Sequence, residues 1–129
     1  MRAADADILI VPGLRGSGPT HWQSRWETKL SSARRVVQTD WEHPRRADWE
    51  ETLARAIAEC RRPAVIVAHS LGVATALHVA RRAAETIAGA FLVAPPSEQA
   101  VRELSCIDAD FLDRKSTRLN SSHIPLSRM

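Results

Sequence analysis

The chain has 129 residues, 44% of them hydrophobic, which is enough for a single globular domain. Its formal net charge is +3, but the segment 113–129 holds four basic residues and one acidic residue, so residues 1–112 are neutral. Charge therefore gives no indication of a nucleic-acid partner. No apolar run approaches the roughly 18 residues of a membrane span. The N-terminus lacks a basic region before a hydrophobic stretch, so we expect a cytoplasmic protein without a signal peptide.

The segment 113–129 differs in kind from the rest of the chain. Residues 113–123, with the sequence DRKSTRLNSSH, match a translated sequencing adapter residue for residue. A match of that length does not arise by chance. We therefore interpret residues 113–129 as a non-native, disordered tail and leave them out of the reasoning about the fold. On this interpretation residues 1–112 are the N-terminal part of one domain, truncated at its C-terminal end.

Strands alternate with helices along residues 1–112. Strands are predicted at residues 7–11, 35–39, 63–68 and 87–93, and helices at residues 21–30, 48–60, 71–84 and 97–104. Thr20 is expected to cap the first helix, and Asp48 the second, with Glu51 at the capping-box position. The alternation predicts a parallel sheet covered by helices on both faces. The expected fold class is therefore α/β, a three-layer α/β/α sandwich.

The two cysteines, Cys60 and Cys106, are isolated and lack the spacing of metal ligands. Cys60 continues the apolar stripe of the second predicted helix, so a buried free thiol is expected rather than a disulfide. The other members of that stripe are Trp49, Leu53, Ala56 and Ile57. The sequence predicts neither a metal site nor a cofactor.

The most informative position is Ser70, which lies between the third predicted strand and an alanine-rich helix. A serine on a sharp strand-to-helix turn is the nucleophile elbow of α/β-hydrolases. Such a turn exposes the hydroxyl at the carboxyl end of the sheet and directs the next amide, that of Leu71, toward a developing oxyanion. Small residues two positions before and two positions after the serine, Ala68 and Gly72, would let the strand and helix backbones pass closely.

Two other interpretations of these residues remain open at this point. Ser70 could serve only as a helix N-cap, since serine is favoured there. The glycines Gly13, Gly16 and Gly18 could form a phosphate cradle, but their spacing lacks the lysine–serine ending of that motif and does not match a dinucleotide fingerprint.

Segments that follow the other strands meet Ser70 at one edge of the predicted sheet. They are the Gly-rich loop 12–19, Asp40 with Trp41, and residues 94–96. In parallel sheets ligands bind outside the carboxyl ends of the strands, so this edge is the predicted site. Asp40 either contributes a carboxylate near the site or anchors its loop by accepting backbone hydrogen bonds.

The chain resembles a known family through several short motifs taken in order. These are ILIVPGL (8–14), THW (20–22), TDW (39–41), the Ser70 turn, and FLVAPP (91–96). Together they resemble the small single-domain serine hydrolases related to retinoblastoma-binding protein 9 and to bacterial YdeN-type proteins. The resemblance implies a compact α/β-hydrolase with a Ser-Asp-His triad, acting without a cofactor on a small ester, amide or thioester.

The resemblance maps the nucleophile onto Ser70 and the oxyanion-hole donors onto the backbone amides of Leu71 and Leu14. In the family the acid and the histidine of the triad follow later strands, so neither is assigned within residues 1–112. His21, Trp41 and His69 are candidate pocket residues. The resemblance implies that His21 is structural, bonded within its loop, although a role as the base stays open.

Because a serine hydroxyl needs an oriented base, we expect the 129-residue chain alone to show little or no turnover. The alternative function is a catalytically silent protein-binding module on the same fold. No sequence feature predicts the oligomeric state or a membrane partner.

Overall fold

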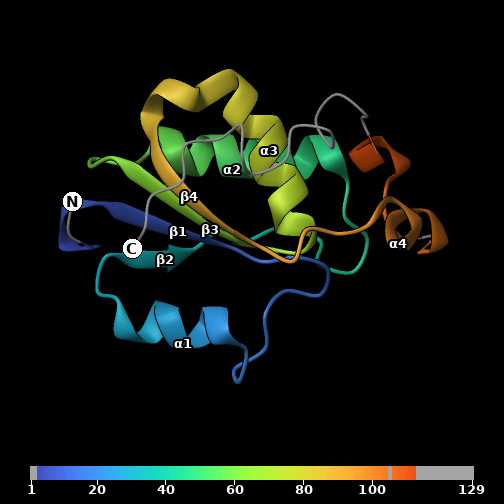
Figure 1. The fold of residues 1–129 in the computed structure, drawn as a ribbon, viewed down its shortest axis with the longest axis horizontal. Coiled ribbons are helices and arrows are strands. Elements are labelled where there is room, and N and C mark those ends of the chain that lie inside the picture. The colour runs from blue at the N-terminus through green and yellow to red at the C-terminus, as the bar shows by residue number, and fades with distance from the viewer. Residues whose placement is uncertain (1–2, 105, 113–129) are drawn as a thin grey trace.

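A computed structural model describes residues 3–104 and 106–112 (Figure 1), so the predicted tail lies outside the described residues. The strands are β1 (Asp7–Val11), β2 (Ala33–Arg35), β3 (Ala64–His69) and β4 (Ile87–Val93). The helices are α1 (Trp22–Lys29), α2 (Arg46–Ala58), α3 (Leu71–Ala83) and α4 (Glu98–Glu103), with short 3-10 turns at Ala3–Asp5, Ala84–Thr86 and Ala109–Leu112. The four strands form one parallel sheet in the order β2-β1-β3-β4. Helix α1 covers one face and α2 and α3 the other, which confirms the three-layer α/β/α fold class.

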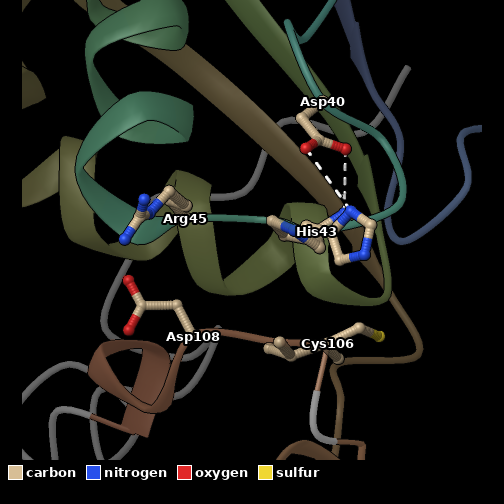
Figure 2. Close-up of a pocket in the computed structure, with 7 residues that line it drawn as sticks. Asp40, His43, Arg45, Cys106 and Asp108 are labelled. Carbon is tan, nitrogen blue, oxygen red and sulfur yellow. Dashed lines mark hydrogen bonds and ion pairs between the residues drawn. The ribbon is translucent and has the colours of Figure 1, made fainter.

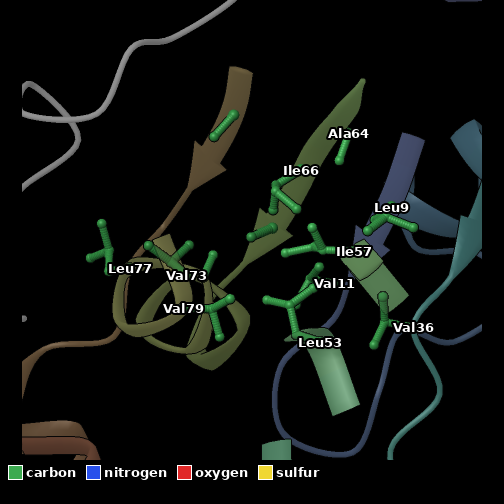
Figure 3. Packing of buried hydrophobic residues seen from close by; sticks show 13 residues of the cluster. Leu9, Val11, Val36, Leu53, Ile57, Ala64, Ile66, Val73, Leu77 and Val79 are labelled. Atoms are coloured by element: carbon green, nitrogen blue, oxygen red, sulfur yellow. The ribbon is translucent and has the colours of Figure 1, made fainter. Parts of the chain in front are cut away.

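The hydrophobic core divides into two layers because neighbouring strand residues point to opposite faces of the sheet. On β3, Ile66 belongs to the cluster beneath α2 and α3, whereas Val65 and Val67 belong to the cluster beneath α1. Figure 3 shows the first cluster, in which Leu9, Val11 and Ile66 meet Leu53 and Ile57 of α2 and Val73 and Val79 of α3. Full burial of each such side chain contributes roughly 1.5–3 kcal/mol. The helix that follows Ser70 is therefore firmly packed on the sheet.

The second strand is the element whose predicted position was wrong. It was expected at residues 35–39 and lies at Ala33–Arg35, paired with β1 from Ile8↔Ala33 to Ile10↔Arg35. One more backbone hydrogen bond, from the Val36 amide to the Ile10 carbonyl (2.9 Å), follows the strand. The next residue, Val37, is 65% exposed. The apolar pattern of this segment is misleading because β2 is an edge strand, and only Val36 and Gln38 of the residues 36–39 are buried after it.

Both predicted helix caps were wrong. The N-cap of α1 is His21 instead of Thr20, because the imidazole accepts the backbone hydrogen bond itself. Helix α2 begins at Arg46, two residues before Asp48, which lies in its first turn instead of at the cap. The Arg46 amide donates to Asp108 Oδ2 (3.1 Å). This cap comes from a residue far along the chain, so no local capping pattern could have predicted it.

The two cysteines are free thiols, as the sequence predicted for Cys60. Both are only half-buried, so the expectation that Cys60 would be buried was wrong. The Cys60 thiol donates to the Ala56 carbonyl at 3.4 Å. Burial raises the pKa of the Cys60 thiol above its ordinary value of 9.0. Within residues 3–104 and 106–112 no helix is long and apolar enough to cross a membrane.

Candidate active site

Ser70 forms the single-residue turn between the end of β3 and the start of α3. Its backbone has φ 54° and ψ −123°, a conformation that residues with a side chain rarely adopt. Such a conformation costs of order 1–3 kcal/mol and persists only where the surroundings enforce it. Here the Ser70 amide donates to the Val93 carbonyl of β4 (3.0 Å), and the Ser70 carbonyl accepts from the Val73 amide (2.8 Å).

The Ser70 hydroxyl takes no part in capping α3, although the residue occupies the N-cap position. Its side chain is half-exposed and has no hydrogen-bond partner within the part of the chain that the structure describes. The interpretation of Ser70 as only a helix N-cap is therefore wrong. The hydroxyl is left accessible at the carboxyl end of β3.

The close passage predicted at Gly72 is confirmed by its contacts with the end of β1. A Cβ atom at position 72 would lie 2.2 Å from the Val11 carbonyl oxygen and 2.8 Å from that of Pro12. Both neighbours are backbone atoms that cannot rotate away. Glycine is therefore required here for the first turn of α3 to approach β1.

The loop after β1 lies directly against the Ser70 turn. A Cβ atom at Gly13 would lie 3.0 Å from both the Leu71 nitrogen and Ser70 Cβ. A tight turn follows, in which the Gly16 amide donates to the Gly13 carbonyl (2.9 Å) and Arg15 has φ 63°. Among the described residues, no hydrogen-bond acceptor receives the amides of Leu14 or Leu71.

Trp41 supports this loop from the side of β2. The Arg15 amide donates to the Trp41 carbonyl (2.9 Å), and a Cβ atom at Gly16 would lie 3.5 Å from the indole ring. The indole meets Trp49 edge-on, with ring centroids 5.8 Å apart. Leu14 and Trp41 pack against the same buried cluster. Trp41 therefore packs against the loop that contains Leu14 and supports it.

Asp40 anchors its own loop, one of the two roles predicted for it. Its Oδ1 accepts backbone hydrogen bonds from Glu42 (3.0 Å) and His43 (2.9 Å). These bonds, that from His43 first, lower the pKa of the Asp40 carboxyl below its ordinary value of 3.8. The carboxylate is thus committed to a turn.

His21 and His69 form a pair of half-buried rings on the α1 side of the sheet. His21 Nδ1 accepts the Gln23 amide at 3.1 Å, so the neutral ring carries its hydrogen on Nε2. The His21 and His69 centroids are 4.7 Å apart, and Trp22 lies 6.0 Å from His69. Burial lowers the pKa of both histidines below the ordinary 6.5. Neither ring hydrogen-bonds to Ser70.

Gln23 is a residue of this region that sequence reasoning missed. It is fully buried, and its carboxamide bonds to Val11, Val67 and Ser17. Gln23 is the one polar residue of α1 that is buried; Ser24 and Glu27 are half-buried, and Arg25, Thr28 and Lys29 are exposed. A glutamine in a helix rich in polar residues is predicted to lie on the surface, so the sequence pattern gave no reason to expect a buried Gln23.

A hollow of about 300 Å³ opens beside the Asp40 turn (Figure 2). Its lining residues are Asp40, His43, Pro44, Arg45, Cys106, Ile107 and Asp108. His43 Nδ1 lies 3.5 Å from Asp40 Oδ2, and both side chains are more than half exposed. Ser70 does not line this hollow, so the hollow is not part of the candidate site.

The fold is α/β, with Ser70 on a strained turn between β3 and α3. A family model described as "Serine hydrolase" matches residues 8–124, so the chain belongs to the serine hydrolase family. That match ends within the segment 113–129, outside the described residues.

Comparison with solved structures gives the same result at the level of the fold. The crystal structure of a YdeN-like hydrolase from Pectobacterium atrosepticum matches with a TM-score of 0.71 and 33% sequence identity. The match covers 80% of this chain and 55% of the other, so the chain spans about half the length of that protein. A comparison with curated proteins found no match. The resemblance to YdeN-type serine hydrolases is thereby confirmed.

Proposed function

We propose that this protein hydrolyses carboxylic esters or related acyl compounds through an acyl-serine intermediate at Ser70. The observation that carries the proposal is the strained turn at φ 54°, with a hydroxyl that caps nothing. Strain of this kind is maintained where a catalytic group must be held in one position. The Leu14 and Leu71 amides, free of other acceptors among the described residues, support the same chemistry.

In the proposed reaction Ser70 Oγ attacks the acyl carbonyl and a bond forms between Oγ and the carbonyl carbon. A base removes the hydroxyl proton, and the Leu71 and Leu14 amides donate hydrogen bonds to the oxyanion. The base gives this proton to the leaving alcohol as the bond between the alcohol oxygen and the carbonyl carbon breaks. Water, deprotonated by the base, then attacks the acyl-serine; the acyl–Oγ bond breaks, the proton returns to Oγ and the acid is released. His21 is a poor candidate for the base because its Nδ1 already accepts the Gln23 amide.

The proposal includes the oxyanion loop, and Gly13 offers a way to test it. Alanine at this position would set a methyl group 3.0 Å from the Leu71 nitrogen and block its approach to a substrate. Loss of one oxyanion donor lowers kcat by about 10²–10³-fold in other hydrolases. Gly13→Ala should therefore react more slowly without losing its nucleophile.

The experiment uses the protein expressed from its complete gene, treated with a fluorophosphonate and mapped by peptide mass spectrometry. We expect the adduct on Ser70, no adduct in Ser70→Ala, and slower labelling of Gly13→Ala. Ser97→Ala, which changes the other serine at a helix N-terminus, is the matched control and should label normally. A folded protein that is never labelled at Ser70 would refute the proposal and favour the protein-binding module.

The 129-residue chain itself provides a second comparison. None of the histidines among the described residues hydrogen-bonds to Ser70, so we propose that this chain alone hydrolyses p-nitrophenyl acetate slowly or not at all. Turnover at the rate of ordinary esterases, lost in Ser70→Ala, would contradict that expectation. The substrate is proposed to be a small ester, amide or thioester, with no cofactor.

A further inference from the structure

Gln23 is a neutral polar side chain that is 0% exposed, held in the first turn of α1. Its Nε2 donates to the Val11 carbonyl (3.2 Å) and to the Val67 carbonyl (3.0 Å), and its Oε1 accepts from the Ser17 hydroxyl (2.6 Å). Both amide hydrogens are thus used. Burying a carboxamide without hydrogen-bond partners would cost folding free energy. The groups around Gln23 supply partners for both its donor and its acceptor atoms.

The two carbonyls that Gln23 binds belong to the strands that lead into the proposed site. Val11 is the last residue of β1 and precedes the loop in which Gly13 touches the Ser70 turn. Val67 lies on the paired strand β3, three residues before Ser70, where Ile10 is its partner in the sheet. One carboxamide therefore links the strand that leads to the loop with the strand that leads to the serine.

The third partner of Gln23 lies near the far end of the same loop. The Ser17 carbonyl accepts from Arg35 Nη1 (2.7 Å) and from Ser24 Oγ (3.2 Å), which fixes this end to α1 and β2. The Gly18 carbonyl also accepts from Ser24 Oγ (2.6 Å). The loop is held at both ends, and Gln23 is the residue that joins both ends to β3.

We propose that Gln23 is a positioning residue for acyl transfer, since its carboxamide holds the loop after β1 in register with the Ser70 turn. The Leu14 amide belongs to that loop and the Leu71 amide to that turn, so Gln23 sets the geometry between them. The inference rests on the proposed function above. It assigns Gln23 no contact with the substrate.

The main test is Gln23→Met, which keeps the length and volume of the side chain and removes all three hydrogen bonds. Oxyanion donors work only within a narrow range of distance, and a displacement of about 1 Å costs up to 10²-fold in rate. We expect kcat for p-nitrophenyl acetate to fall about 10- to 100-fold with KM nearly unchanged. Ser17→Ala removes only the link to the loop, so its loss should be smaller and its fold less disturbed.

Leu53→Ala is the control for loss of stability alone, because Leu53 is fully buried between α2 and the sheet and lies outside the proposed site. All variants are made in the protein expressed from its complete gene and assayed where each is folded by circular dichroism. If Gln23→Met and Ser17→Ala keep the kcat that Leu53→Ala shows per folded molecule, the positioning role is overturned.

A second measurement separates failure of this inference from failure of the proposed function. The amide resonances of Gly13, Leu14 and Leu71 are followed by NMR in the same variants. We expect them to move in Gln23→Met and Ser17→Ala but not in Leu53→Ala. If the wild type neither turns over nor labels at Ser70, the proposed function fails, and these resonances alone decide whether Gln23 positions the loop. Unchanged resonances would overturn the inference in either case.

Discussion

Ser70 and Ser97 each occupy the N-cap position of a helix that follows a strand, but only one of the two hydroxyls caps its helix. Ser70 follows β3 and precedes α3, and Ser97 follows β4 and precedes α4. Ser97 has φ −73° and ψ 153°, and its hydroxyl accepts the Ala100 amide at 3.0 Å, as an N-cap should. Ser70 has φ 54° and leaves its hydroxyl uncommitted.

The surroundings of the two turns explain the difference. Ser97 and the residue two positions later, Gln99, are exposed, so nothing prevents the relaxed capping geometry. The Ser70 turn is confined by Val93 of β4 and by the carbonyls of Val11 and Pro12 that face Gly72. Capping stabilises a helix, whereas the confined turn gives up that stabilisation and keeps its hydroxyl free. The comparison teaches that tertiary packing decides what a serine at a helix N-terminus does.

The largest expected effect comes from filling the confined turn. Gly72→Ala places a methyl group 2.2 Å from the Val11 oxygen, where only backbone could yield. We expect a loss of about 3 kcal/mol or more in the free energy of unfolding, measured by urea denaturation. Gly18→Ala is the control, because no atom lies within 4 Å of the added Cβ. Equal stability of the two variants would mean that the turn is not confined.

Smaller changes in the free energy of unfolding, of opposite sign, are expected when Ser70 and Ser97 are replaced. Ser70→Gly relieves the positive φ and should raise the free energy of unfolding by about 1 kcal/mol while removing the nucleophile. Ser97→Ala removes a cap and should lower it by about 1 kcal/mol. Thermal denaturation of both variants beside the wild type measures the contrast. If both substitutions destabilise the protein, the strain assigned to Ser70 is incorrect.

The smallest effect concerns the histidines beside the Ser70 turn. Burial lowers the pKa of His21 and His69 in the folded protein, so the unfolded chain binds more protons as the pH falls through 6.5. Stability should therefore decrease on acidification from about pH 7 and level off once the folded-state pKa is passed. The pKa of the Asp40 carboxyl is lowered from 3.8, so the stability that this carboxylate contributes is lost only in more acidic solution.

Urea denaturation at several pH values between about pH 8 and pH 5 checks this prediction. His69→Gln should reduce the pH dependence, whereas the same substitution at His43, whose side chain is 72% exposed, serves as the surface control. A pH dependence that survives in a His21→Gln, His69→Gln double variant would assign it to other groups.

The chain's own pattern was sufficient for much of the fold. The apolar runs predicted β1 and β4 with the bounds observed, and the alanine-rich segment after Ser70 predicted α3 to within one residue. Strand β1 and the first turns of α3 are buried almost throughout, so their patterns reflect their environment. Strand β4 was predicted with the same accuracy although only Gly89 and Ala90 are buried in it. The small residue at position 72 was also identified correctly from local spacing.

Features that depend on distant partners were not predictable in this way. The Asp108 carboxylate that caps α2 lies 62 residues from Arg46, and the Val67 carbonyl lies 44 residues from the Gln23 carboxamide that binds it. In each case the local residues permit several conformations, and a partner from another element selects one.

The amino-acid sequence by itself determined the α/β class, the order of the main elements and the serine between β3 and α3. Hydrophobic periodicity and glycine spacing are local properties, and they carry that information. Only the tertiary structure decided that Ser70 would be strained and uncapped, that His21 would cap its own helix, and that Gln23 would be buried. These outcomes depend on competition for hydrogen bonds and space among segments that meet only after the chain has folded.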